Sequence, residues 1–127
     1  MKIAGLLILV ATLFSSTNFG ERALRPGHWG GTGIEVRVLA GSSDVELDCA
    51  HGMIMEQFSV DRHGHFDLAG TYESGPLVLP PPFRPAHYVG DVNGKTMRLM
   101  IRLDDTGETV GPFHLTRGVM PVIIKCL

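Results

Sequence analysis

The sequence predicts an all-β protein, an antiparallel up-and-down meander of about eight strands that closes into a small β-barrel. Three observations support this fold class. Short runs of alternating apolar and polar residues recur from Ile34 to the end, turn signals containing glycine separate them, and no helical periodicity follows residue 17. A meander of this size usually closes, because closure removes exposed strand edges. A two-sheet β-sandwich is the alternative fold.

The clearest hairpin covers residues 86–103, where two alternating runs meet at Asn93-Gly94. Asn-Gly between such runs favours a type I′ turn, since both central residues of that turn take positive φ. A turn centred there places Tyr88 opposite Leu99 on the core face. We therefore expect this hairpin to form the centre of the sheet.

Two earlier hairpins are predicted from the same alternation. In residues 34–50 a loop over residues 40–43 would pair Val38 with Val45. In residues 54–73 a turn at residues 61–64 would pair Ile54 with Tyr72. The second register leaves Glu56 on the core side, opposite a glycine.

A further turn at residues 104–107 would pair Leu99 with Phe113, with a bulge at Gly111-Pro112. The last run, residues 120–127, is predicted to return beside that strand as the eighth strand.

The first residues have the outline of a secretory signal peptide. Lys2 precedes an uncharged apolar run over residues 3–14, and the small residues Ser15 and Thr17 follow. The run is shorter than the ~20 residues that span a bilayer. We predict a signal peptide at 1–17, an extended N-terminal arm at 18–33 and a barrel domain at 34–127. An uncleaved membrane tether is the alternative.

Without Lys2 the chain has 10 Lys and Arg against 13 Asp and Glu, a net charge of 10 − 13 = −3. This balance provides neither a nucleic-acid footprint nor a polybasic membrane patch. We therefore expect a protein or small-molecule partner, with no nucleic acid and no membrane after signal cleavage.

The two cysteines are Cys49 and Cys126. An even number of cysteines in an exported chain favours a disulfide, and two buried free thiols are the alternative. The chain is thus predicted to be secreted or periplasmic.

Catalytic and metal-binding motifs are missing from the sequence. It contains no G-x-S-x-G elbow, no HExxH and no paired CxxC. Of six histidines, His63 and His65 lie around one turn and His51 ends another hairpin, and zinc needs three or four convergent ligands. We expect no enzyme activity, no cofactor and no resident metal, and solvated turn histidines; a surface metal site is the alternative.

Two groups of residues are candidates for binding. Glu56, Tyr72 and Tyr88 face inward in the predicted registers and could form a polar site at one barrel mouth. A bulge that turns Glu56 to water is the alternative.

The second candidate is a partner-binding surface. The proline-rich stretch over residues 74–85 carries the apolar residues Leu77, Leu79 and Phe83, and the arm carries Trp29. The alternatives are a lid over the barrel mouth for the loop and a plug in the barrel end for Trp29.

Gly27-His28-Trp29 before the first predicted strand, together with Arg117 near the last turn, resembles the arrangement of the lipocalins and related calycin barrels. The resemblance implies that Trp29 plugs the closed end and that Arg117 lies across it. The chain lacks a lipocalin's length and C-terminal helix. In size it is also similar to small disulfide-bearing periplasmic barrels that inhibit lysozyme or metalloproteases.

The sequence therefore predicts an exported, non-enzymatic binding protein. The first hypothesis is recognition of another protein, including inhibition of a hydrolase, through the proline-rich loop and the N-terminal arm. The alternatives are a small-ligand carrier that binds inside the barrel and histidine-mediated metal binding.

Overall fold

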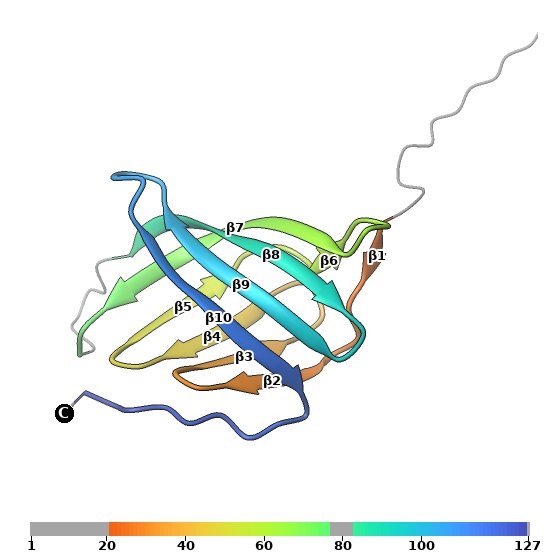
Figure 1. The fold of residues 1–127 in the computed structure, drawn as a ribbon. Coiled ribbons are helices and arrows are strands. Elements are labelled where there is room, and N and C mark those ends of the chain that lie inside the picture. Colours follow the sequence, from red (N-terminus) through yellow and green to blue (C-terminus); the bar gives the residue numbers. More distant parts are fainter. Residues whose placement is uncertain (1–20, 77–82, 127) are drawn as a thin grey trace, which may run out of the picture.

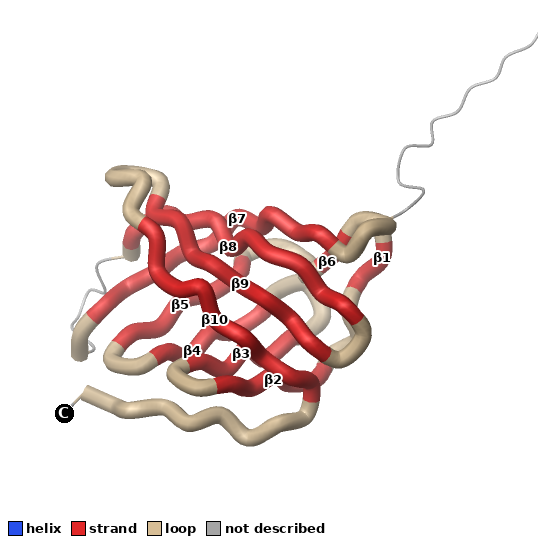
Figure 2. The backbone as a smooth tube through the Cα atoms, viewed as in Figure 1, coloured by secondary structure: helices blue, strands red, loops and turns tan. Residues whose placement is uncertain are grey.

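The computed structural model describes residues 21–76 and 83–126, which form a closed antiparallel β-barrel (Figure 1). The eight barrel strands follow one another in the order β10-β2-β3-β4-β5-β7-β8-β9. These described residues contain no helix, so the predicted fold class is confirmed (Figure 2). The predicted signal peptide lies outside the described residues. The strands are β1 (Arg22–Ala23), β2 (Gly27–Gly31), β3 (Ile34–Val38), β4 (Ser43–Leu47), β5 (Ala50–Ile54), β6 (Ser59–Val60), β7 (His65–Ser74), β8 (Arg84–Asn93), β9 (Thr96–Leu103) and β10 (Thr109–Arg117).

Apolar side chains from alternate positions of the strands fill the barrel. They form one buried cluster whose largest members are Trp29, Tyr88 and Phe58. The rings of Phe58 and Phe66 meet edge to face, with centroids 4.8 Å apart. An eight-stranded barrel is just wide enough for its own side chains, and this interior is used for packing.

The central hairpin joins β8 to β9 with the predicted faces but a different turn. Gly94 and Lys95 occupy the two central positions, and Gly94 alone has positive φ, at 63°. Positive φ at the first central position only is the pattern of a type II′ turn. The predicted pairing is therefore wrong by two residues, and Tyr88 lies opposite Ile101. A shift of two preserves the pleat, so Tyr88 still faces the core.

Two other predicted registers are corrected by the same amount. Val36, rather than Val38, pairs with Val45, because the four-residue loop between β3 and β4 covers residues 39–42 rather than 40–43. Ile54 pairs with Gly70 rather than Tyr72. After Ile54 the chain leaves the barrel wall, and β6 pairs with β1 instead. The predicted pairing of Leu99 in β9 with Phe113 in β10 is confirmed. The predicted bulge before Phe113 is confirmed too.

The strand that closes the barrel is β2, which lies within the stretch predicted as an arm. The barrel therefore begins at Gly27 rather than Ile34. Glycines permit this, because a Cβ at Gly30 would collide with the carbonyl oxygen of Val119, and one at Gly31 with that of His114. Their low strand propensity hid a strand that needs close backbone approach.

The last run is not a barrel strand, which corrects the predicted eighth strand. Residues 119–126 instead cross outside the β2–β3 turn (Figure 1). Gly33 N–H donates to the Val122 carbonyl (2.7 Å), and Val122 N–H donates to the Gly31 carbonyl (3.1 Å). The segment ends at a disulfide between Cys49 and Cys126, whose Cα atoms are 4.8 Å apart. The predicted disulfide is thus confirmed, and such bonds are typical of oxidising compartments such as the extracellular space or the periplasm.

Within residues 21–76 and 83–126, no helix has the length and apolar character needed to cross a lipid bilayer.

Candidate binding groove

The predicted inward position of Glu56 is wrong. Glu56 is exposed, and its Oε2 accepts a hydrogen bond from the Ala69 N–H at 2.8 Å. The cause is the departure of the chain from the barrel wall after Ile54, which turns the carboxylate to water. Glu56 therefore does not join the two tyrosines inside the barrel.

Tyr72 and Tyr88 do face inward, as predicted. The Tyr88 hydroxyl donates to the Thr71 carbonyl at 2.6 Å, and the side chain is fully buried. It lies close over Gly52 and Gly70, where any Cβ would press against the ring or its hydroxyl. Burial raises the pKa of both phenols above the ordinary value. Tyr88 thus braces the backbones of β5 and β7 from within.

Trp29 and Arg117 lie opposite each other where β10 ends against β2, and we refer to this end of the barrel as the closed end. The Trp29 side chain is 2% exposed, and the Arg117 guanidinium lies over its ring, 5.7 Å from the centroid. Arg117 also donates to the carbonyls of Pro26 (3.2 Å) and Arg25 (3.5 Å). The geometry expected of this pair is present, and Trp29 is too buried to contact a partner.

The proline-rich stretch is described only in part. Leu77 and Leu79 lie outside the described residues, so their predicted role is not placed. Phe83 is described and is 59% exposed.

A groove of about 660 Å³ lies on the outer side of the barrel wall, across β3, β4, β5 and β7. Its apolar lining includes Met53, Met55 and Phe83, all exposed. Its polar lining includes Arg37, Asp44, Glu46, His51 and Glu73. The sequence does not reveal this groove, because its residues lie on strands that become neighbours only in the closed sheet.

The groove contains a buried carboxylate, Glu73. Glu73 and His51 lie directly opposite each other on β7 and β5, and His51 Nε2 contacts Glu73 Oε1. The Glu73 side chain is only 2% exposed, and apart from the His51 contact neither of its carboxylate oxygens has a hydrogen-bond partner among the described residues. The predicted register placed Met53 opposite Glu73, so no local pattern indicated this pair.

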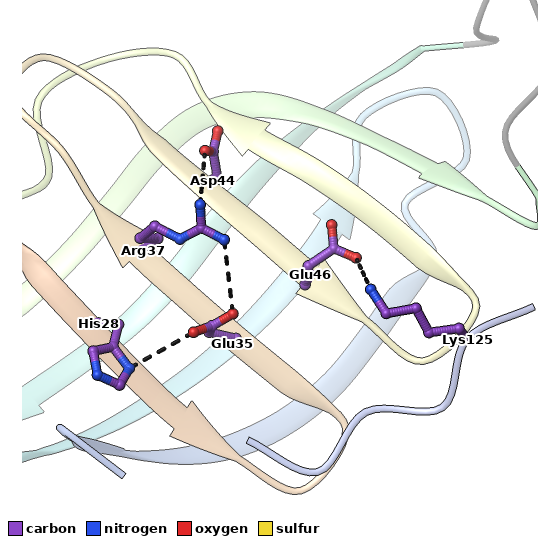
Figure 3. Close-up of polar contacts among 6 residues, drawn as sticks. All are labelled: His28, Glu35, Arg37, Asp44, Glu46 and Lys125. Carbon is purple, nitrogen blue, oxygen red and sulfur yellow. Dashed lines mark ion pairs between the residues drawn. The ribbon is translucent and has the colours of Figure 1, made fainter. Parts of the chain in front are cut away.

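The neighbouring outer face carries a chain of ion pairs (Figure 3). Arg37 lies between two carboxylates, at 4.0 Å from Asp44 and 4.0 Å from Glu35, and His28 approaches Glu35 at 3.6 Å. Lys125, from the C-terminal segment, lies 4.0 Å from Glu46. These partly exposed pairs add little stability. In them, the cations nearest the groove, Arg37 and Lys125, are already paired with carboxylates.

The charge of the groove lining is therefore negative. Among the described residues that line it are the three carboxylates of Asp44, Glu46 and Glu73 and one guanidinium, that of Arg37, which is already paired. A smaller cleft of about 120 Å³ beside the disulfide shares Glu46 and His51 with the groove. The arrangement combines an anionic floor with apolar side chains at the surface.

In the described part of the chain, no group of three or more His, Cys, Asp or Glu side chains is arranged to hold a metal ion. His63 and His65 instead donate their backbone N–H groups to Asp61 Oδ1, at 2.8 and 2.9 Å. These hydrogen bonds lower the pKa of the Asp61 carboxyl, and they hold the turn between β6 and β7.

The fold and groove define a closed eight-stranded antiparallel barrel with an anionic, partly apolar outer face. Comparisons with models of protein families, with curated proteins and with solved structures found no match.

Proposed function

We propose that this chain is an exported, non-enzymatic binding protein that recognises another protein through the groove on the outer face of β3, β4, β5 and β7. The observation that carries the proposal is the groove itself, which combines exposed Met53, Met55 and Phe83 with a buried carboxylate. Exposed apolar side chains gathered around a concavity favour interaction sites. Methionines suit such a surface because their flexible thioethers adapt to a partner.

The packed interior favours this function over that of a small-ligand carrier. Phe58, Tyr88 and Leu99 are fully buried in one apolar cluster, and Phe66 packs against the first of them. A carrier that binds inside the barrel needs a cavity of a few hundred Å³ lined by these side chains. The groove outside the wall supports recognition at the surface instead.

The proposal revises which segments make contact. Phe83 brings the end of the proline-rich stretch to the groove. The N-terminal arm is held in place, because β1 pairs with β6 and Leu24 N–H donates to the Phe58 carbonyl at 2.8 Å. We therefore assign recognition to the groove and the Phe83 end of the loop, and not to the arm.

Two finer parts of the proposal have narrower support. The apolar run after Lys2 and the disulfide both favour export. The contact between Trp29 and Arg117 supports a relation to the calycins, and small size with a disulfide supports hydrolase inhibition.

The test is selection of a displayed library of random peptides on the mature, oxidised protein. We expect enriched peptides that bind wild type about tenfold more tightly than Met55→Asp or Phe83→Asp, a change of ~1.4 kcal/mol. Met120→Asp is the matched control, because Met120 is 78% exposed on the C-terminal segment and does not line the groove. The proposal would be contradicted if no peptide is enriched, or if the enriched peptides bind Met55→Asp and Phe83→Asp as tightly as wild type.

A further inference from the structure

We propose that Glu73 forms a binding subsite for a guanidinium group, so that the partner presents an arginine side chain to the groove. This inference rests on the proposed function and names the chemistry of its partner. It starts from Glu73, whose side chain is 2% exposed although its strand position faces outward.

The Glu73 carboxylate has an incomplete set of hydrogen-bond partners. A carboxylate accepts about four hydrogen bonds, and burial without them is costly. His51 Nε2 contacts Oε1, and apart from this contact neither Oε1 nor Oε2 has a hydrogen-bond partner among the described residues. A guanidinium presents several N–H donors in a fixed plane that matches a carboxylate. An arginine side chain would supply what Oε2 lacks.

Apolar side chains line the groove beside Glu73. Met53, Met55 and Phe83 line the same groove as Glu73 and are exposed. An arginine side chain has an aliphatic stem that packs on apolar groups and a flat cation that stacks on aromatic faces. The lining therefore offers surfaces for both parts of that side chain.

Among the described residues that line the groove, no guanidinium is free to pair with Glu73. Arg37 is the guanidinium that lines the groove, and it already lies between Asp44 and Glu35. Asp44 and Glu46 add negative charge around Glu73. Like-signed charges in a concave site raise the local concentration of an oppositely charged group. The groove thus attracts a cation, and its described lining holds no unpaired guanidinium.

The strands β5 and β7 beneath the groove are held by Tyr88 from inside the barrel. Thr71 lies two residues before Glu73 on β7 and accepts a hydrogen bond from the Tyr88 hydroxyl at 2.6 Å. Tyr88 also packs beneath Gly52, the neighbour of His51 on β5. The two strands that carry Glu73 and His51 are therefore held from inside, and a site on rigid elements loses less entropy on binding.

The test uses N-acetyl-L-arginine amide as the probe, titrated onto the full mature chain and followed by two-dimensional NMR. N-acetyl-L-citrulline amide is the matched control, because it has nearly the same shape without the charge. We expect the arginine probe to shift the signals of His51 and of the Met53 and Met55 methyl groups. We expect the citrulline probe to bind at least about tenfold more weakly.

Two variants sharpen the result. Glu73→Gln keeps the size of the side chain and is expected to weaken arginine-probe binding about tenfold. Phe83→Ala leaves the carboxylate intact and is expected to weaken it about threefold, so the test survives if Glu73→Gln does not fold. Equal binding of the two probes, no binding of either, or unchanged binding to a folded Glu73→Gln would overturn the subsite.

The peptide selection distinguishes this inference from the proposed function. Selected peptides that contain arginine and lose binding in Glu73→Gln support both. Peptides without basic residues that bind Glu73→Gln normally, yet are lost in Met55→Asp, overturn the subsite and leave recognition by the groove standing.

Discussion

The closed end of the barrel and the outer groove each hold a charged side chain against the barrel wall, and they treat it differently. At the closed end, Arg117 covers the Trp29 ring and donates to the carbonyls of Arg25 and Pro26. In the groove, Glu73 is buried, and among the described residues its carboxylate has His51 as its one polar contact. The first charge stabilises the fold, whereas burial of the second costs free energy that its contacts do not offset. A buried carboxylate of the second kind supports the proposed role of Glu73 in binding.

The comparison also separates packing from hydrogen bonding. The Trp29 Nε1 has no hydrogen-bond partner among the described residues, so the ring is held by burial and by the cation above it. Tyr88 is equally buried, but its hydroxyl donates to the Thr71 carbonyl. Truncation at these two sites and at Glu73 should therefore have three different effects on stability.

The largest effect is expected at the closed end. Trp29→Ala should lower the free energy of unfolding by about 4 kcal/mol, because it removes the largest buried ring and leaves a cavity. Urea denaturation followed by far-UV circular dichroism measures the change. Met53→Ala in the groove is the control and should cost less than about 1 kcal/mol, since Met53 is exposed. Equal losses at the two sites would remove the distinction between them.

An intermediate and pH-dependent effect is expected at Tyr88. Tyr88→Phe should cost about 1 kcal/mol at pH 8, because the Thr71 carbonyl loses its donor. Burial raises the pKa of Tyr88, so the unfolded chain releases this proton first, and stability falls as pH rises past about 10. The phenylalanine variant has no phenol to ionise at this position, so the stability difference between wild type and Tyr88→Phe should nearly vanish at about pH 11. Paired urea titrations at the two pH values measure it, and a constant difference would contradict the prediction.

An effect of similar size to that at Tyr88, but with the opposite sign, is expected at Glu73. Glu73→Leu should raise the free energy of unfolding by about 1 kcal/mol, because replacing a buried charged group by an apolar one of similar size is often stabilising. The same variant should lose the selected peptides. Thermal and urea unfolding measure the stability change. A loss of more than about 2 kcal/mol would instead make Glu73 part of the fold, like Arg117.

Much of the fold could be predicted because it depends on local patterns. Alternation placed Tyr88, Leu99 and Val36 on the core face, and each of the three register errors was a shift of two residues, which leaves the faces unchanged. The pairing of Leu99 with Phe113 was predicted in register, and it is reached through the predicted bulge, which shifts the β9–β10 pairing by one residue between Val110 and Phe113.

The candidate site could not be predicted for the same reason. A shift of two leaves the core unaltered but changes which outer residues are neighbours, and it replaced Met53 by His51 opposite Glu73. The inward position predicted for Glu56 failed because nothing in the local pattern marks the point where the chain leaves the wall after Ile54.

The all-β class, the inward faces, the bulge at Gly111-Pro112 and the cysteine pair follow from the amino-acid sequence, because each depends on residue type, spacing or count. Three features became apparent from the folded chain: β2 closes the barrel, residues 119–126 cross outside it, and Glu73 is buried against His51. These features arise from approaches between segments far apart in the chain, and the energy of such contacts is not written in the local pattern of either segment.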